Sequence, residues 1–192
     1  MIERMLDNLN LDSDSSVLDI GFYGLNGSNG SKGIAKRFHQ HGEITGIVWI
    51  EGITLEEFIT KRGMCYPNIN VIWEDYYTSI EKINTKFDLI YIDMGADIQI
   101  DILENSLERF HSMLNPAGFL VTFVFAHSMY NGKEKEVEDH YKRWWDLCPH
   151  TSKLDDETIS NQFNEKYGKY FEVGKIYQDK RDLIKWVTLK KK

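Results

Sequence analysis

Short apolar segments alternate with amphipathic helical segments over the first two thirds of the chain. The predicted strands are residues 17–21, 44–50, 69–73, 87–92 and 119–125. The predicted helices, which carry apolar residues at helical spacing, are 2–9, 31–41, 54–63 and 98–114. This alternation indicates a parallel sheet, because each parallel pair needs a long crossover connection that a helix supplies.

The last third of the sequence has a different pattern. Residues 134–147 and 155–167 are predicted helices, and residues 171–177 and 183–189 are predicted strands joined by a short polar turn. So short a connection makes the last two strands antiparallel. We therefore predict an α/β fold, a doubly wound, mostly parallel sheet of seven strands with helices on both faces and a C-terminal antiparallel hairpin.

The composition excludes several classes of protein. A chain of 192 residues with 42% hydrophobic residues suits one domain with a full core. Acidic residues exceed basic ones by 30 to 23, so general binding of nucleic acid is not expected. No signal core or membrane-length apolar stretch is found, which predicts a cytoplasmic protein that does not enter a membrane.

No metal site is expected from the sequence. Cys65 and Cys148 lie far apart, which excludes a disulfide scaffold and a Cys-rich zinc site. His39 and His41 are two residues apart near a helix end and point in different directions.

The candidate functional residues follow the predicted strands, since sheets of this kind bind ligands beyond the carboxyl ends of their strands. They lie in the loop 19–30 and at Glu51, Asp75, Asp93 and His127. Four of the five strand ends carry an acidic residue, which is more than a purely structural edge requires.

Several segments resemble motifs of the class I S-adenosylmethionine-dependent methyltransferases. The similar segments are residues 17–21, 70–75, 87–93, the Leu-x-Pro-Gly-Gly-like turn 113–120, and 185–189. Their order and spacing cover nearly the whole chain. The resemblance implies a single methyltransferase-like domain, with a cofactor-binding part (1–125), helices on the substrate side (126–168) and a closing hairpin (169–192).

The resemblance also implies roles for the loop after the first strand. Gly21, Gly24 and Gly27 would let the backbone approach the amino-acid part of S-adenosylmethionine. Asp19 would order this loop or contact the methionine amino group.

Residues after the other strands receive roles in the same way. Glu51 would accept hydrogen bonds from the ribose hydroxyls, and Asp75 would accept one from the adenine amino group, with Tyr76 near the ring. Asp93 and Met94 would lie beside the methyl group that is transferred.

The chain departs from the family pattern at two places. Tyr23 and Leu25 stand where the second and third glycines of the family's loop belong. Val48 occupies the position of the ribose-binding acid, so Glu51 takes that role only if the second strand runs on or its loop bends back.

The catalytic candidates are Asp93 and His127. Asp93 would act as a general base or orient a substrate hydroxyl or amine, unless it is simply an exposed strand-end acid. The His127 imidazole would take a proton from a substrate O–H or N–H group, unless it is simply solvated.

Taken together, these residues predict transfer of a methyl group to an O or N atom of a small molecule or a protein. The departures motivate a second hypothesis, a catalytically inactive methyltransferase-like binding or scaffold subunit. An RNA methyltransferase is less favoured because of the acidic composition. A protein that binds NAD or a nucleotide is also less favoured, since the loop matches neither the Walker A nor the G-x-G-x-x-G pattern.

Overall fold

The computed structural model describes residues 2–22, 29–38, 40–62, 68–94, 96–125, 155–178 and 184–192. The strands are β1 (Ser16–Ile20), β2 (Glu43–Val48), β3 (Ile69–Trp73), β4 (Phe87–Ile92), β5 (Leu114–Phe125), β6 (Phe171–Gln178) and β7 (Ile184–Lys191). The helices are α1 (Ile2–Asn8), α2 (Asn29–Phe38), α3 (Leu55–Arg62), α4 (Tyr76–Lys82), α5 (Ala96–Met113) and α7 (Asp156–Tyr167). Every strand predicted from the sequence is present.

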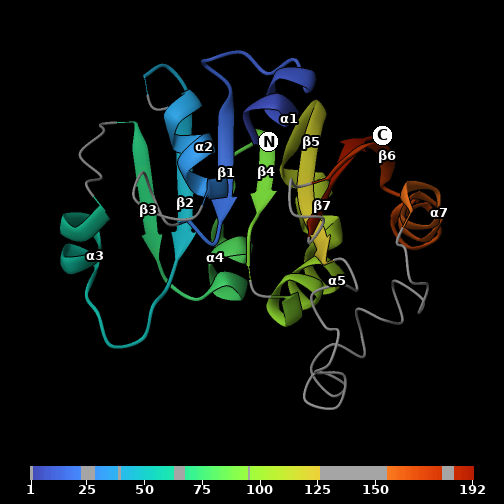
Figure 1. The fold of residues 1–192 in the computed structure, drawn as a ribbon. Helices are drawn as coiled ribbons and strands as arrows, with labels where there is room; N and C mark the ends of the chain where they lie inside the picture. The colour runs from blue at the N-terminus through green and yellow to red at the C-terminus, as the bar shows by residue number, and fades with distance from the viewer. Residues whose placement is uncertain are drawn as a thin grey trace, which may run out of the picture.

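The strands form one seven-stranded sheet in the order β3-β2-β1-β4-β5-β7-β6 (Figure 1). The pairs among β1 to β5 are parallel, whereas β7 is antiparallel to β5 and β6. The predicted parallel sheet with its closing hairpin is thus confirmed. The parallel strands end together at the lower edge in Figure 1, which is called the carboxyl edge below. The strand order reverses between β1 and β4, and ligands of such sheets bind at that point.

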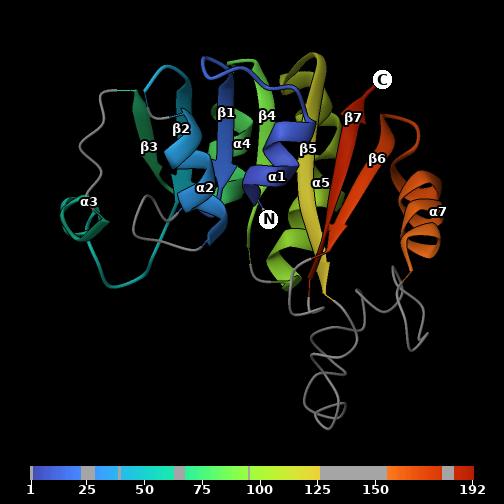
Figure 2. The same ribbon diagram turned by 45° about the horizontal axis from the view of Figure 1, so that its top comes forward.

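Helices cover both faces of the sheet, as predicted. Figures 1 and 2 show α1 and α2 on one face and α4 and α5 on the other. Neighbouring residues of β1 point to opposite faces, as in any strand. Val17 belongs to one buried apolar cluster with Phe38 of α2, and Leu18 belongs to a second cluster with Phe110 of α5. The alternation along a strand therefore divides the core into two layers.

Helix α4 is an element that the sequence did not predict. It is only seven residues long, and its buried residues are Ser79 and Ile80, which is too little to show a helical period. Asp75 begins the helix by accepting a hydrogen bond from the Thr78 backbone N–H at 3.0 Å. The sequence analysis assigned no element to the residues between 69–73 and 87–92, and α4 fills this interval. Helix α2 also starts earlier than the predicted 31, at Asn29 within the expected loop 19–30, and it ends at Phe38.

Strand β5 begins at Leu114, five residues before its predicted start at 119. The added residues are irregular. Leu114 pairs with Phe87 and Phe119 with Leu89, so the register shifts between the two pairs. Ala117 lies in this interval with a φ of 63°, which is rare for a residue with a Cβ. The expected turn before the strand is therefore an irregular extension of it.

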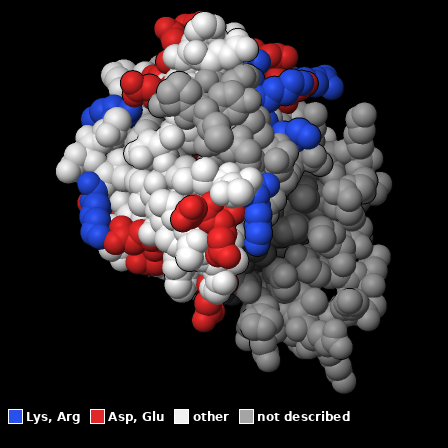
Figure 3. All heavy atoms as spheres, turned by 90° about the vertical axis from the view of Figure 1, so that its left-hand side faces the viewer, with Lys and Arg blue, Asp and Glu red and all other residues white. Residues whose placement is uncertain are grey.

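The two edges of the sheet differ in the residues that they present. At one end, β6 carries Glu172 and Lys175, its register shifts between Val173 and Ile176, and α7 packs beside it. At the other end, β3 has no charged residue between 69 and 73. Helix α3 lies beside β3 at this end, where Phe58 packs on Trp73 with ring centres 5.3 Å apart. Figure 3 looks onto this end and shows acidic and basic side chains around an uncharged area.

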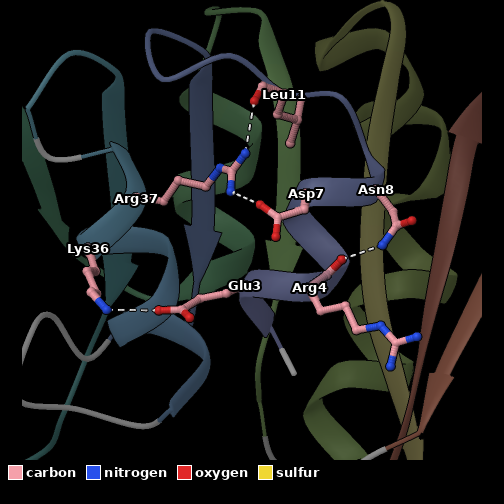
Figure 4. Close-up of polar contacts among 7 residues, drawn as sticks. All are labelled: Glu3, Arg4, Asp7, Asn8, Leu11, Lys36 and Arg37. Carbon is pink, nitrogen blue, oxygen red and sulfur yellow. Dashed lines mark hydrogen bonds and ion pairs between the residues drawn. The ribbon is translucent and has the colours of Figure 1, made fainter.

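Helix α1 is held to α2 mainly by apolar burial. Met5 and Leu6 of α1 are fully buried. Around them, Lys36 pairs with Glu3 at 3.0 Å, and Arg37 contacts the Asp7 carboxylate and the Leu11 carbonyl (Figure 4). The Lys36–Glu3 pair is more than 60% exposed on both sides, and such pairs stabilise little. The polar contacts therefore contribute to the orientation of α1 on α2 more than to the stability of their packing.

Helix α7 covers the sheet near β6. Ile159, Phe163 and Tyr167 are buried in the same cluster as the inner face of α5, and Lys166 pairs with Glu104 of α5. The rest of the segment 126–168, including the predicted helix 134–147, lies outside the described residues, and its assignment to the substrate side stays a prediction. No helix in the described part of the chain is long and apolar enough to cross a bilayer.

Candidate functional site

The carboxyl edge is closely packed where β1 and β4 meet. Gly21 follows β1 with a φ of +89°, and a Cβ built on it would lie 2.4 Å from the Asp93 carbonyl oxygen and 2.6 Å from the Met94 sulfur. The Asp93 N–H donates to the Ile20 carbonyl at 3.0 Å. Only glycine fits this crossing, because both the dihedral angle and the space exclude a side chain. The structure thus brings Gly21, Asp93 and Met94 together.

The Gly21 backbone is also tied to β2. The N–H groups of Gly21 and Phe22 both donate to the Ile47 carbonyl, each at 3.1 Å. The Phe22 side chain is fully buried against Gly46 of β2. The start of the loop after β1 is therefore fixed to the strands on both sides of it.

Two acidic residues lie on the same face of the sheet around Tyr91. Asp19 is fully buried and pairs in register with Tyr91, and Asp93 follows Tyr91 by two residues along β4. The Tyr91 hydroxyl donates to Asp93 Oδ2 at 3.4 Å. Burial, followed by the charges of Asp93 and Asp19, raises the pKa of Tyr91 well above its ordinary value. Tyr91 therefore remains a hydrogen-bond donor, and it lies between two carboxyl groups at the edge where β1 and β4 meet.

The Tyr91 ring is held by aromatic neighbours. It stacks on Trp186 of β7 with ring centres 5.2 Å apart, and Trp186 also contacts Phe123 of β5 at 5.0 Å. Tyr91 is fully buried, so its hydroxyl has little freedom to move. A buried, packed donor of this kind fixes the orientation of the carboxylate that it contacts.

Gln99 connects the end of β4 to β5. Its side chain is fully buried, and its Nε2 donates to the Phe123 carbonyl at 2.7 Å and to the Thr122 hydroxyl. Its Oε1 accepts a hydrogen bond from the Met94 N–H at 3.5 Å. Because a buried amide is costly unless it is bonded, this arrangement favours one position of the backbone at Met94.

Asp75 and Tyr76 lie where β3 passes into α4. The Thr78 hydroxyl, and then its backbone N–H, hold the pKa of Asp75 below its ordinary value by hydrogen bonding. The carboxylate therefore has a structural task as the helix cap, in addition to the adenine contact that the sequence predicts for it. Tyr76 is half-buried and packs against the core cluster that includes Ile80.

The end of β2 lacks an acidic side chain. The strand ends at Val48, which is buried and pairs with Trp73 of β3. Trp49 follows and is 51% exposed. Glu51 is exposed and stands in a turn that Gly52 closes with a φ of +82°. The strand does not run on to Glu51, so the ribose role predicted for this residue depends on the turn alone.

Three predicted site residues cannot be placed in this description. Gly24, Gly27 and His127 lie outside the described residues. Among the residues that are described, no group of three His, Cys, Asp or Glu side chains is arranged to hold a metal ion.

Tyr91 and Gln99 were not singled out from the sequence, although signals for both are present. Tyr91 precedes Asp93 by two positions in a strand, so their side chains point to the same face. Gln99 shares the inner face of α5 with Leu103 and Phe110, where a polar side chain is unusual.

A hollow of about 360 Å³ lies at the opposite, amino-terminal edge of the sheet, between Asn10, Asp88, Ala117 and Lys190. The Asp88 carboxylate is already bonded, since it accepts from the Ser16 N–H and hydroxyl and from the Asn115 amide. We therefore place the candidate site at the carboxyl edge.

Comparison with known proteins bears on the fold. No family model matches the chain, and no curated protein sequence matches it. Solved structures do match. A fibrillarin/Nop5p complex is 19% identical over 99% of this chain and 79% of its own, with a TM-score of 0.61. A SAM-dependent methyltransferase from Aquifex aeolicus is 15% identical over 100% of this chain and 89% of its own, also with a TM-score of 0.61.

A third structure is the O-methyltransferase TomG from Streptomyces achromogenes in complex with SAM. It is 8% identical over 99% of this chain and 77% of its own, with a TM-score of 0.61. These likenesses extend over almost the whole chain and agree with the strand order observed here. The chain therefore has the class I methyltransferase fold.

Proposed function

We propose that this protein is an S-adenosylmethionine-dependent methyltransferase that acts on an O or N atom of a small molecule or a protein. The observation that carries the proposal is the packing of Gly21 on Asp93 and Met94 at the point where the strand order reverses. This packing brings the start of the loop after β1 and the residues after β4 together at the point where sheets of this kind bind their ligands.

The residues at this edge fit the charge of the cofactor. S-adenosylmethionine carries a positive ammonium and a positive sulfonium, and Asp19 and Asp93 place negative charge on the same face. Gly21 and Asp19 would hold its amino-acid part, with Gly24 and Gly27 contributing as the sequence predicts. Asp75, Tyr76 and Glu51 would hold the adenosine.

When bound, the cofactor supplies an electrophilic methyl group. The work of the chain is then to position a nucleophile and to accept its proton. Asp93 is the proposed acceptor or orienting group, with Met94 beside the methyl and His127 as a second candidate base. The Tyr91 hydroxyl would keep the Asp93 carboxylate in one orientation, since it already donates to that group at 3.4 Å.

A specific observation favours a second candidate, a methyltransferase-like binding or scaffold subunit without activity. Val48 is buried at the end of β2, and the nearest following acid, Glu51, stands in an exposed turn. A missing ribose contact would weaken cofactor binding. The fibrillarin structure is a complex with Nop5p, which makes a protein partner a reasonable form for such a subunit.

Calorimetric titration with S-adenosylhomocysteine, with NAD as the control ligand, tests the proposal. Micromolar binding of the first ligand alone is expected. Asp93→Asn should abolish methyl transfer to any substrate found. Asp12→Asn, the same change at an exposed residue on the opposite edge, should leave it intact.

A well-folded protein that binds no S-adenosyl ligand would overturn the proposal and favour the inactive subunit. Binding of NAD alone would instead favour a nucleotide-binding protein. The cytoplasmic location and the class of substrate remain predictions.

A further inference from the structure

A smaller hollow, of about 250 Å³, lies between the end of α5 and the loop that joins α4 to β4. Both segments are at the amino-terminal edge of the sheet, the upper edge in Figure 1, because the loop directly precedes β4 and α5 directly precedes β5. Strand β4 has six residues, which places the hollow about 20 Å along the strand from Asp93. A ligand bound here would therefore not touch the candidate site at the carboxyl edge.

The charged residues that line this hollow are all basic. They are Lys86, from the loop before β4, and Arg109, from α5, and no acidic residue of the described part of the chain lines it with them. The other polar residues of the lining are Asn84, Thr85 and Ser112. Acidic residues outnumber basic ones by 30 to 23 in the whole chain. The hollow thus carries positive charge on a protein that is acidic as a whole.

The guanidinium group of Arg109 is held in place by the end of α4. Its Nε donates to the Ile80 carbonyl at 3.2 Å. Its Nη2 donates to the Glu81 carbonyl at 3.2 Å and also to the Ile83 carbonyl. Its Nη1 has no hydrogen-bond partner among the described residues. A group that is already fixed and still has donors free loses little further freedom when it binds an anion.

Two ammonium groups lie close together beside the end of α5. Lys86 Nζ donates to the Ser112 carbonyl, and Lys191 Nζ, from β7, donates to the Leu114 carbonyl at 2.6 Å. Neither lysine forms an ion pair with a carboxylate of the described residues. Burial, followed by the charge of Lys86, lowers the pKa of Lys191 below its ordinary value. The two positive charges therefore repel each other, and an anion bound at Lys86 would relieve this repulsion.

We propose that this hollow binds a phosphate group, which is either inorganic phosphate or the terminal phosphate of a small molecule. Its volume is below the roughly 300–1,000 Å³ of sites for drug-sized ligands, so it suits a single group of this size. Phosphate oxygens can accept hydrogen bonds from Arg109 Nη1 and Lys86 Nζ together, and such bonds between ionised groups are strong. The exposed Asn84 amide and Thr85 hydroxyl can donate further hydrogen bonds.

Thermal unfolding of the full chain in sodium phosphate and in sodium chloride tests this proposal. The two solutions have the same ionic strength, so that charges are screened equally. At ten times a Kd of about 1 mM, inorganic phosphate should raise the melting temperature by about 3–6 °C relative to chloride. The same titration with glycerol 3-phosphate distinguishes the two sources. Tighter binding of this ester than of inorganic phosphate would identify a phosphorylated small molecule, and weaker binding would identify inorganic phosphate.

Variants separate binding in the hollow from the general stabilisation of folded proteins by phosphate. Lys86 is exposed, so Lys86→Met should fold, which circular dichroism checks. This variant loses a charged donor, so its Kd for phosphate should rise about tenfold and most of the shift in melting temperature should disappear. Lys36→Met makes the same change of charge at an exposed residue of α2, on the other face of the sheet, and should keep the full shift.

Equal shifts in the unchanged protein and in Lys86→Met would overturn the proposal, because the effect of phosphate would then be the general one. Equal melting temperatures in phosphate and chloride would also overturn it. The same holds if Lys36→Met loses as much of the shift as Lys86→Met does. These measurements need no S-adenosyl ligand, so their outcome is independent of the proposed methyltransferase function.

Discussion

Substituting alanine at two glycines isolates the packing at the carboxyl edge. Gly21 and Gly52 have nearly the same φ, +89° and +82°. A Cβ on Gly52 would meet nothing within 4 Å, whereas a Cβ on Gly21 would lie 2.4 Å from the Asp93 carbonyl oxygen. Gly52→Ala therefore adds only the strain of a positive φ, and Gly21→Ala adds the same strain together with a collision.

The expected magnitudes follow from these two contributions. Positive φ costs a residue with a Cβ about 1–2 kcal/mol, partly offset by about 0.4–1 kcal/mol because alanine reduces the freedom of the unfolded chain. Gly52→Ala should thus lower the free energy of unfolding by about 1 kcal/mol or less. At Gly21 the Met94 sulfur belongs to a flexible side chain, but the colliding Asp93 carbonyl belongs to a backbone that is hydrogen-bonded to Ile20. The collision should add about 1–3 kcal/mol, as overpacking of a core does.

Urea unfolding followed by circular dichroism measures both variants against the unchanged protein. We expect Gly21→Ala to be less stable than Gly52→Ala by about 1–3 kcal/mol. Equal losses in the two variants, within about 0.5 kcal/mol, would show that β1 and β4 do not approach as closely as described. The comparison does not depend on which ligand the site binds.

Three further predictions concern single side chains. Asp75→Ala and Asp155→Ala each remove a helix cap, so each should lower the free energy of unfolding by about 1 kcal/mol. Only Asp75→Ala should weaken the binding of S-adenosylhomocysteine measured by calorimetry. Equal affinities of the two variants would contradict the adenine role of Asp75. Ala117→Gly should raise the melting temperature. The strain of a φ of 63° that it relieves in the folded state is larger than the stability lost because glycine makes the unfolded chain more flexible. A lower melting temperature would refute this. Burial raises the pKa of Asp88, but hydrogen bonds from the Ser16 N–H, the Asn115 amide and the Ser16 hydroxyl more than offset it, so the pKa lies below its ordinary value. The stability that the ionised Asp88 carboxylate contributes is then complete above about pH 4, and it is lost as the pH falls through the lowered pKa. The urea midpoints of Asp88→Asn and of the unchanged protein should therefore differ at neutral pH and approach each other at acidic pH. A difference that is constant with pH would contradict this.

Much of the sheet was predictable from short runs of apolar residues. β1 and β4 are buried on both faces, so their apolar residues are consecutive and mark the strands without any knowledge of their neighbours. Asp93 was predictable for the same reason, since it directly follows a buried strand, whereas Asp19 lies inside β1 and Glu51 stands in the turn beyond β2. α4 was not predictable, because a helix of two turns with one buried apolar residue leaves no period to detect.

The candidate site was predictable as a set of positions and not as an arrangement. Asp19 and Asp93 are separated by more than 70 residues in the sequence, and only the register of β1 on β4 brings both to Tyr91. The sequence shows a glycine at 21, but the reason that it must be glycine is the backbone of Asp93, which lies on another strand. At the end of β2, only the structure shows that the strand stops at Val48 and leaves Glu51 in a turn.

The sequence by itself determined all seven strands and the longer described helices, and the faces that these elements bury, because these properties depend on the spacing of residues along a few turns or pleats. The tertiary structure alone decided the order and the register of the strands. It also decided the contacts of Gln99 with Met94 and Phe123. Such contacts join residues on different elements, and their geometry depends on how the whole sheet twists and packs rather than on any local pattern.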